Sequence, residues 1–338
     1  MTAAAVPATH GEVWLRARPD GLLSTDHFEV VRVPVPEAKA GQVLVRNRLM
    51  SVAAVMRTVM QGGSDLPIPV AALGEPLWAP AVGEVVAAPG GELEPGAVVT
   101  HGLGWREYAV VDVADAERVD PSVLPDEAAY LSQAVTAWIG VVRGGEVRPG
   151  DTVFVTGAAG GVGTMAGQFA RLRGAGRVIG STGSRLKGDY LVRELGYDAV
   201  VIRGAGPIEE QLREAAPDGL DVVFDNVGGE QLVAALAVAR RGARVALVGA
   251  LSGQLAGGFT APAGIDTGSL IVRGITLRGT SASDHLDAIP EGMREFGRGL
   301  REGTVVFPHA RLSGIDQAPR ALCELLEGRH TGAVLVEL

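Results

Sequence analysis

The stretch from residue 151 to residue 187 constrains the fold of this chain more than any other part of the sequence. Residues 152–156 are β-branched and aromatic, and residues 157–163 are too rich in glycine to form an ordinary helix. Apolar residues then recur at helical spacing over 164–173, and residues 177–180 are again extended in character. The pattern predicts a strand, a tight turn, a helix and a second strand, which together make one βαβ unit.

The turn in that unit has the glycine spacing of a dinucleotide-binding loop, Ala158-x-Gly160-x-x-Gly163. Small residues are needed there because the chain turns tightly, approaches a pyrophosphate without an intervening side chain and packs its helix closely on the sheet. The unpaired amides at the start of the helix then face the anion. In a chain with 48 glycines the spacing alone can arise by chance. Its place between a strand and a helix is what favours a dinucleotide site.

The end of the second strand indicates which dinucleotide is bound. An NAD site has an Asp or Glu about 20 residues after the glycine pattern, to accept hydrogen bonds from the ribose. Here the first acid is Asp189, and the strand ends in Gly180-Ser181-Thr182-Gly183-Ser184. Hydroxyls and amides followed by Arg185 and Lys187 suit a 2′-phosphate. Lys187 is one of only two lysines, and the alternative is an ordinary solvated helix residue. The sequence thus favours NADP over NAD.

The composition limits the class of protein. A chain of 338 residues exceeds the usual size of a single core, so two domains are expected. A net charge of −9 without a basic run argues against nucleic acid and anionic membranes as partners. The single cysteine, Cys323, excludes an internal disulfide and a cysteine-built zinc site. The absence of a long apolar run and of a charged signal start predicts a cytoplasmic protein.

The rest of the chain divides into two patterns. Residues 12–130 show short strands broken by Pro and Gly turns, which predict an antiparallel β-barrel-like domain. Residues 125–142 have the spacing of one helix that crosses between domains. After residue 187 strands and helices alternate, and residues 269–280 are expected to be the last strand pair of an α/β domain. We therefore predict a barrel domain over 1–124, completed by 303–338, and a doubly wound domain over 125–302.

With these pieces in place, the chain resembles the medium-chain dehydrogenases/reductases, in particular their zinc-free branch of prostaglandin reductases, leukotriene B4 12-hydroxydehydrogenases and 2-alkenal double-bond reductases. The resemblance covers nearly the whole length. It rests on NRLMSVAAVMR (47–57), VGEVV (82–86), GWREYAVV (104–111), TAW (136–138), TGAAGGVG (156–163), GSTGSRLK (180–187), VFDNVGGE (223–230), VGALSG (248–253) and LLEGRHTGAVLV (325–336).

The resemblance implies a fold, a cofactor and a set of binding residues. In this family a GroES-like barrel at both chain ends and a central Rossmann domain enclose a cleft, in which NADPH delivers hydride to the β-carbon of an α,β-unsaturated carbonyl. By position, the pyrophosphate would lie at Ala159, Gly160, Gly161 and Val162, and the 2′-phosphate near Gly183, Ser184 and Lys187. The nicotinamide half would be edged by Asn226, Val248, Gly249, Ala250 and Ser252.

Each of two further residues, Arg203 and His330, has two possible roles. Arg203 stands where relatives often have a tyrosine, and it either pairs with the 2′-phosphate or is one of many surface arginines. His330 stands where relatives commonly have an asparagine that reaches the cofactor, and it is otherwise a satisfied surface histidine.

Two departures from the family pattern bear on the reaction. The family's Asp-Pro-Tyr-Met is Ala53-Ala54-Val55-Met56 here, and Gln254 replaces a second tyrosine. These phenols are the usual groups that polarise the substrate carbonyl or donate a proton. Without them the oxyanion would depend on Gln254, Gln133, Thr136, a ribose hydroxyl of the cofactor or water.

Three functions therefore remain open at the level of sequence. The leading one is NADPH-dependent reduction of an activated C=C bond, because hydride addition needs positioning rather than an acid. The second is a quinone or carbonyl reductase, or a biosynthetic enzyme with altered chemistry in the same pocket. The third is an NADPH-binding protein without turnover.

No metal site is expected. The zinc-binding relatives have a Gly-His-Glu segment where this chain has Leu73-Gly74-Glu75-Pro76, and its six histidines are scattered. Of these, His101 is expected to face the cleft or, alternatively, to be a structural histidine of a barrel turn. The apolar segment 269–280 would need cover as an edge strand and predicts a homodimer, because this strand pairs across a dimer axis in the family.

Overall fold

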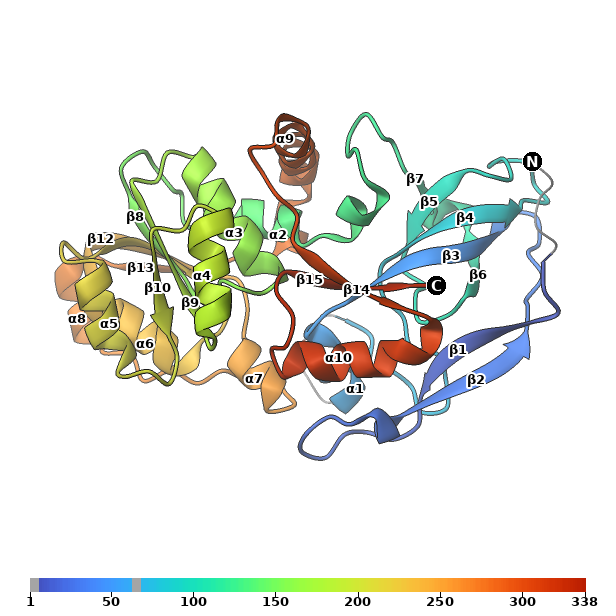
Figure 1. The fold of residues 1–338 in the computed structure, drawn as a ribbon, viewed down its shortest axis with the longest axis horizontal. Coiled ribbons are helices and arrows are strands. Elements are labelled where there is room, and N and C mark those ends of the chain that lie inside the picture. The colour runs from blue at the N-terminus through green and yellow to red at the C-terminus, as the bar shows by residue number, and fades with distance from the viewer. Residues whose placement is uncertain (1–5, 63–67) are drawn as a thin grey trace. The chain divides into compact units, whose positions relative to one another are not determined.

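The computed structural model of the protein describes residues 6–62 and 68–338. The chain folds into two compact units, one formed by Met1–Ser132 with His309–Leu338 and the other by Gln133–Pro308. Residues 125–132 thus group with the first unit and residues 303–308 with the second, a few residues beyond the boundaries predicted from sequence. Each unit has a sheet of its own (Figure 1).

The second unit is built on a six-stranded sheet in which every pair of neighbours is parallel. The order β10-β9-β8-β11-β12-β13 starts in the middle and grows first to one side and then to the other, as in a doubly wound Rossmann fold. The predicted α/β class is confirmed. The strands are β8 (Thr152–Val155), β9 (Arg177–Thr182), β10 (Ala199–Ile202), β11 (Leu220–Asp225), β12 (Ala239–Leu247) and β13 (Thr276–Gly279).

Helices connect these strands and supply the core. They are α3 (Gly161–Leu172), α4 (Arg185–Glu194), α5 (Ile208–Ala215), α6 (Gly229–Val238) and the short α7 (Leu251–Leu255). Because crossovers between parallel strands are right-handed, α3 and α4 cover one face of the sheet and α5 and α6 the other. Phe154 and Val223 of the sheet lie in one buried cluster with Leu212 of α5 and Leu232 of α6. Each such side chain stabilises the fold by about 1.5–3 kcal/mol when it is fully buried.

The predicted crossing helix over 125–142 is wrong in detail, because the structure breaks it into three pieces. These are the 3-10 turn η3 (Glu127–Leu131), α2 (Ala134–Ile139) and a π-helical turn η4 (Gly140–Gly144). Ser132 has extended backbone and separates the first two. At Gly140 a Cβ atom would lie 2.8 Å from Cζ of Phe224, so the absence of a side chain lets the helix approach the sheet.

The predicted strand pair over 269–280 is also wrong in its first half. Residues Thr267–Arg273 form helix α8, and only β13 is a strand. The run Leu-Ile-Val has strand propensity, but Asp266 caps the helix by accepting a 3.3 Å hydrogen bond from the amide of Ser269. Gly274, with φ +60, ends the helix in the left-handed conformation. The remaining helical segment is η5 (Ala282–Ala288) followed by α9 (Ile289–Glu302), with Pro290 in the first turn of α9.

The first unit has a seven-stranded sheet in the order β14-β15-β3-β4-β5-β7, with β6 also paired to β3, and a separate two-stranded ribbon of β1 and β2. All pairs are antiparallel except β14 with β15, and β15 pairs with β3. The GroES-like barrel class predicted from sequence fits this arrangement. The strands are β1 (Thr9–Leu15), β2 (Phe28–Pro34), β3 (Gln42–Val52), β4 (Ala81–Ala87), β5 (Val98–His101), β6 (Tyr108–Asp112), β7 (Glu117–Arg118), β14 (His309–Ser313) and β15 (Ala333–Glu337).

Two helices, α1 (Val55–Gln61) and α10 (Ala318–Leu326), pack against this sheet. Short 3-10 turns lie at η1 (Thr25–His27), η2 (Val113–Asp115) and η6 (Ile315–Gln317). The core of the unit is formed by Met50, Leu77, Trp105 and Leu322 with their neighbours, and Trp105 stacks on Phe28 at a centroid distance of 5.9 Å. Across residues 6–62 and 68–338, no helix has the length and apolar character needed to cross a membrane.

Candidate functional site

The candidate site lies in the second unit, where the parallel strands end. Because the strands are parallel, the loops that follow Val155, Thr182, Ile202, Asp225 and Leu247 gather at one edge of the sheet. Between β8 and β11 the chain connections leave in opposite directions, which opens a crevice in sheets of this kind.

The glycine turn after β8 has the shape of a phosphate cradle. Gly157 has φ +59, a conformation that favours glycine, and Gly160 caps α3 with extended backbone. A Cβ atom on Gly163 would lie 2.6 Å from Cα of Ala158, so the helix can approach the turn only without a side chain. At Gly160 the nearest atom would be the oxygen of Gly157, 3.5 Å away, and this side of the turn is open. A ligand phosphate can therefore reach the first amides of α3.

Ser181 stabilises this turn through hydrogen bonds. Its hydroxyl accepts a 3.0 Å hydrogen bond from the amide of Gly157 and donates a 2.5 Å hydrogen bond to Oε1 of Gln231, while its carbonyl accepts from the amide of Ala158. The side chain is buried. Ser181 was predicted from sequence to offer its hydroxyl to a phosphate, but in the structure this hydroxyl holds the turn.

The ends of β9 and β10 form a second, cationic corner. Ile202 lies opposite Thr182 in the sheet, so Arg203 follows directly beside Gly183. Nη2 of Arg203 is 3.1 Å from the position of a Cβ atom on Gly183. Ser184 caps α4 and accepts a 3.4 Å hydrogen bond from the amide of Lys187. Burial lowers the pKa of the half-buried Lys187 ammonium.

The structure thus brings together Gly183, Ser184 and Arg203. Lys187 lies in the first turn of α4, the helix that Ser184 caps. The segment 180–188 contains no acidic residue. The corner therefore offers cations, a hydroxyl and amides to an anion, which is the donor set that a phosphate group requires.

Asp225, at the end of β11, forms hydrogen bonds to the loop after β8 and to the loop after β11. Its carboxylate accepts hydrogen bonds from Oγ1 of Thr156 at 2.7 Å and from the amides of Val227 and Gly228 at 3.2 and 2.9 Å. Burial raises the pKa of this carboxyl group. Asp225 and Thr156 were not predicted from sequence as site residues. The available signal was an acid at the end of a buried apolar strand.

The predicted residues of the nicotinamide half lie around this carboxylate. Nδ2 of Asn226 donates a 2.8 Å hydrogen bond to the carbonyl of Thr156, and the amides of Val248 and Gly249 donate to the carbonyl of Asp225. A Cβ atom on Gly249 would lie 2.7 Å from the oxygen of Asn226. Ala250 is the N-cap of α7 and Ser252 lies on that helix, where its hydroxyl donates to the carbonyl of Val227 at 2.7 Å.

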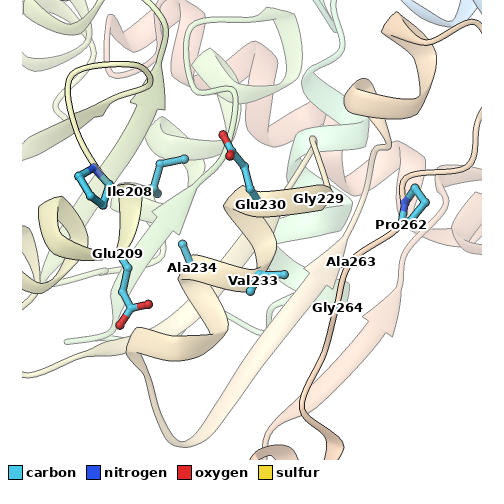
Figure 2. A pocket seen from close by; sticks show the side chains of 10 residues that line it. Ile208, Glu209, Gly229, Glu230, Val233, Ala234, Pro262, Ala263 and Gly264 are labelled. Atoms are coloured by element: carbon cyan, nitrogen blue, oxygen red, sulfur yellow. The ribbon is translucent and has the colours of Figure 1, made fainter.

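An open pocket of about 510 Å³ lies at the starts of α5 and α6 (Figure 2). Its walls are formed by Pro207, Ile208, Glu209, Gly229, Glu230, Val233, Ala234, Pro262, Ala263 and Gly264, none of which was predicted as a site residue. Figure 2 shows its two carboxylates, Glu209 and Glu230, on different helices. Because carboxylates repel phosphate, this pocket does not suit the charged part of a dinucleotide.

The candidate catalytic residues lie on two different elements of the second unit. Gln254 is half-buried on α7. Thr136 lies on α2, and Gln133 precedes that helix as its N-cap. Oε1 of Gln133 is buried and has no hydrogen-bond partner within the described part of the chain. Val55, at the position of the first missing tyrosine, begins α1 in the other unit.

The histidines singled out by sequence both lie in the first unit. Nε2 of His330 is 2.9 Å from Oε2 of Glu324, which forms a local ion pair when the imidazole is protonated. His101 is buried, and its Nε2 donates a 2.8 Å hydrogen bond to Oδ1 of Asn47. Among residues 6–62 and 68–338, no three His, Cys, Asp or Glu side chains gather in a way that could hold a metal ion.

Comparison with known proteins agrees with this architecture. Residues 12–119 match the family described as the N-terminal domain of oxidoreductase, and residues 161–297 match the family described as zinc-binding dehydrogenase. The chain is 34% identical to a putative NADP-dependent oxidoreductase of Bacillus subtilis, over 98% of each chain. It is 30% identical to prostaglandin reductase 1 of Oryctolagus cuniculus, over 90% of this chain and 86% of that protein.

A solved structure is similar over the same length. The crystal structure of CurA from Vibrio vulnificus in complex with NADPH has a TM-score of 0.88 and 28% identity, and the match covers 97% of this chain and 98% of that one. An NADPH-dependent curcumin reductase of Escherichia coli is also 28% identical, over 96% of this chain. Since these matches span both units, the chain belongs to the medium-chain dehydrogenase/reductase family, in the zinc-free branch that contains the prostaglandin reductases.

Proposed function

We propose that this protein is an NADPH-dependent oxidoreductase that reduces the C=C bond of an α,β-unsaturated carbonyl compound. The observation that carries the choice of NADPH is the cationic corner at the ends of β9 and β10, where Arg203 approaches Gly183 beside Ser184 and Lys187. An NAD site would have a carboxylate at this place. Relatives named as prostaglandin, curcumin and 2-alkenal reductases support the substrate class.

The turn fits the rest of the cofactor. The open side of Gly160 and the first amides of α3 would hold the pyrophosphate, next to Ala159, Gly161 and Val162. Asn226, Val248 and Ala250 would edge the nicotinamide. We assign the 2′-phosphate to Arg203 and Lys187 of the second unit and leave out of this assignment His330 of the first unit, whose Nε2 contacts Glu324.

The bound cofactor supplies a hydride for the β-carbon of the substrate, and negative charge then develops on the carbonyl oxygen. A glutamine amide is a hydrogen-bond donor but does not release a proton at neutral pH. In this proposal Gln254 stabilises the oxyanion, with Gln133, the N-cap of α2, and Thr136 of α2 as further candidates, and the proton for the α-carbon comes from water.

Cofactor choice can be tested with the two lysines of the chain. We expect Lys187→Ala to raise the KM for NADPH by about 10- to 100-fold and to leave the KM for NADH nearly unchanged, because a charge-assisted hydrogen bond contributes about 1.5–3 kcal/mol. Lys39→Ala is the matched control, since Lys39 is exposed in the first unit. Equal losses with both cofactors would contradict the assignment of the 2′-phosphate.

The substrate class is tested by following NADPH oxidation at 340 nm with enals, enones and quinones, together with analysis of the products. Saturated carbonyl products are expected from enals and enones. Oxidation with quinones alone would favour the quinone reductase alternative, and NADPH binding without turnover on any acceptor would favour a non-catalytic role. Gln254→Leu should lower kcat on enones without changing the Kd for NADPH, and unchanged turnover would remove Gln254 from the mechanism.

We also propose a homodimer that pairs through β13, the edge strand of the second sheet. Ile271 and Val272 on the preceding helix α8 are 80% and 68% exposed, which is unusual for large apolar side chains. Light scattering at micromolar concentration should give twice the mass of the chain, and Ile271→Lys should shift the equilibrium toward the monomer. A monomeric wild-type protein would refute this proposal.

A further inference from the structure

A buried polar pair, Thr156 and Asp225, joins two strands that are far apart in sequence. The Thr156 hydroxyl donates a 2.7 Å hydrogen bond to Oδ1 of Asp225 and accepts a 2.8 Å hydrogen bond from the amide of Asn226. Both side chains are almost completely buried, with exposed fractions of 0% and 1%. The pair therefore links the start of the glycine turn to the loop after β11 at the point where the sheet reverses its winding.

The Asp225 carboxylate is held by neutral donors. It accepts from one hydroxyl and two backbone amides, and among the described residues no Lys, Arg or His forms an ion pair with it. Removing a carboxylate from water costs several kcal/mol unless its hydrogen bonds are replaced. An apolar residue would avoid this cost, so stability alone does not account for a carboxylate at the end of β11. Its three donors fix the loop that begins at Asn226.

The same contacts fix the orientation of the Asn226 side chain. Its amide lies 2.8 Å from the carbonyl oxygen of Thr156, which can only accept a hydrogen bond. The contacting atom is therefore Nδ2, and Oδ1 is directed away from that carbonyl. Within the described residues Oδ1 has no hydrogen-bond partner, and Asn226 is only half-buried. A hydrogen-bond acceptor is thus left at the carboxyl edge of the sheet.

The glycine turn is held on its other side by a second buried chain of hydrogen bonds. The amide of Gly157 donates to Ser181, and Ser181 donates to Gln231 on α6. The turn is consequently fixed at Thr156 and at Gly157 before any ligand arrives. Such preorganisation lowers the free energy that binding would otherwise spend on ordering the loops.

We infer that Thr156 and Asp225 are positioning residues for the cofactor. They hold Asn226, which the proposed function already places at the nicotinamide half, so that its Oδ1 accepts a hydrogen bond from the ribose hydroxyls or carboxamide of that half. The inference rests on the proposed function, because it concerns the same cofactor. The inference gives the residues two different effects on affinity. Thr156 and Asp225 set the geometry of the turn and so affect the whole ligand, whereas Asn226 contacts only the nicotinamide riboside half.

Binding of two ligands to the purified full chain separates these effects. We expect Thr156→Val to raise the Kd of NADPH and of 2′-phospho-ADP-ribose, which lacks the nicotinamide, by about tenfold each. Asn226→Leu should raise the Kd of NADPH about tenfold and leave the Kd of 2′-phospho-ADP-ribose within twofold of wild type. Thr156→Ser keeps the hydroxyl and should restore both affinities. Calorimetric titration gives the Kd values.

The control for lost stability is Thr280→Val, which removes a buried hydroxyl from the same unit after the edge strand β13. It should lower the melting temperature without changing either Kd. Wild-type affinity for NADPH in either Thr156→Val or Asn226→Leu would overturn the inference. If Thr156→Val does not fold, Asn226→Leu and Asp225→Asn decide it, with the same expected losses for NADPH. A wild-type protein that binds no NADPH would instead refute the proposed function.

Discussion

Each unit of the protein contains a buried cluster of polar side chains, and the two clusters differ in whether their hydrogen-bonding capacity is used up. In the first unit Nδ2 of Asn47 donates to the carbonyls of Leu103 and Arg106, and Oδ1 accepts from His101. Nδ1 of His101 accepts from the amide of Leu103. Every hydrogen-bonding atom of the two side chains has a partner, so this cluster stabilises a loop and can hold no ligand.

The cluster around Asp225 in the second unit is open on one side. Its buried members hold loops, but those loops end beside the open side of Gly160 and in the half-buried side-chain amide of Asn226. Sequence alone did not separate the two cases, because both contain polar residues at strand ends. The comparison shows that a candidate ligand residue is recognised by the hydrogen bonds it has left to make.

The largest effect should come from disturbing the close packing of helix α3 on the glycine turn. We expect Gly163→Ala to weaken NADPH binding by at least about 100-fold, or roughly 2.7 kcal/mol, because its Cβ would lie 2.6 Å from Cα of Ala158 and force the helix away from the turn. Gly279→Ala is the control, since a Cβ there meets no atom within 4 Å. Titration of NADPH fluorescence measures both. Normal affinity in Gly163→Ala would show that the turn is not the pyrophosphate site.

A large effect on the free energy of unfolding is expected in the cluster of Asn47 and His101 in the first unit. Burial lowers the pKa of His101 from 6.5 to about 4, so the folded protein resists a proton that the unfolded chain accepts. The stability that this provides is present above pH 6.5 and is lost as the pH falls toward about 4, with an upper limit of about 3 kcal/mol. Urea unfolding between pH 7 and 4.5 should show the loss.

His101→Gln should flatten this dependence on pH and leave the Kd for NADPH at pH 7 unchanged. A changed Kd in this variant would mean that the two clusters are not functionally separate, and an unchanged pH profile would mean that the buried imidazole is not the titrating group.

These contrasts also show what could be predicted from the sequence. The βαβ unit and the buried strands were predictable because parallel strands are continuous apolar runs bounded by glycine. Helix α8 was not, because its Leu-Ile-Val run has strand propensity and a single N-cap, Asp266, decides otherwise. The contact of Thr156 with Asp225 joins residues 69 positions apart and depends on β8 and β11 being neighbours. Local patterns carry no information on such a pair.

The role of Arg203 was left open by the sequence for a similar reason. Its place beside Gly183 follows from the pairing of β9 with β10, which brings the ends of two strands together. We expect Arg203→Ala to raise the KM for NADPH about tenfold, because the guanidinium is exposed and its charge is partly screened. Arg193→Ala, at the far end of α4, is the control. An equal rise in the KM for NADPH and for NADH would indicate that Arg203 does not contact the 2′-phosphate.

The smallest effect is expected at Ser252, although its position in the family pattern places it at the nicotinamide. Its hydroxyl already donates a 2.7 Å hydrogen bond to the carbonyl of Val227, so it belongs to the bonds that hold the loop. Ser252→Ala should cost about 1 kcal/mol of stability and change the Kd for NADPH by less than about twofold. Thermal unfolding and calorimetric titration measure the two quantities. A tenfold loss of affinity without a loss of stability would show that the hydroxyl exchanges its partner for the cofactor, and that hydrogen bonds already made do not exclude a residue from ligand binding.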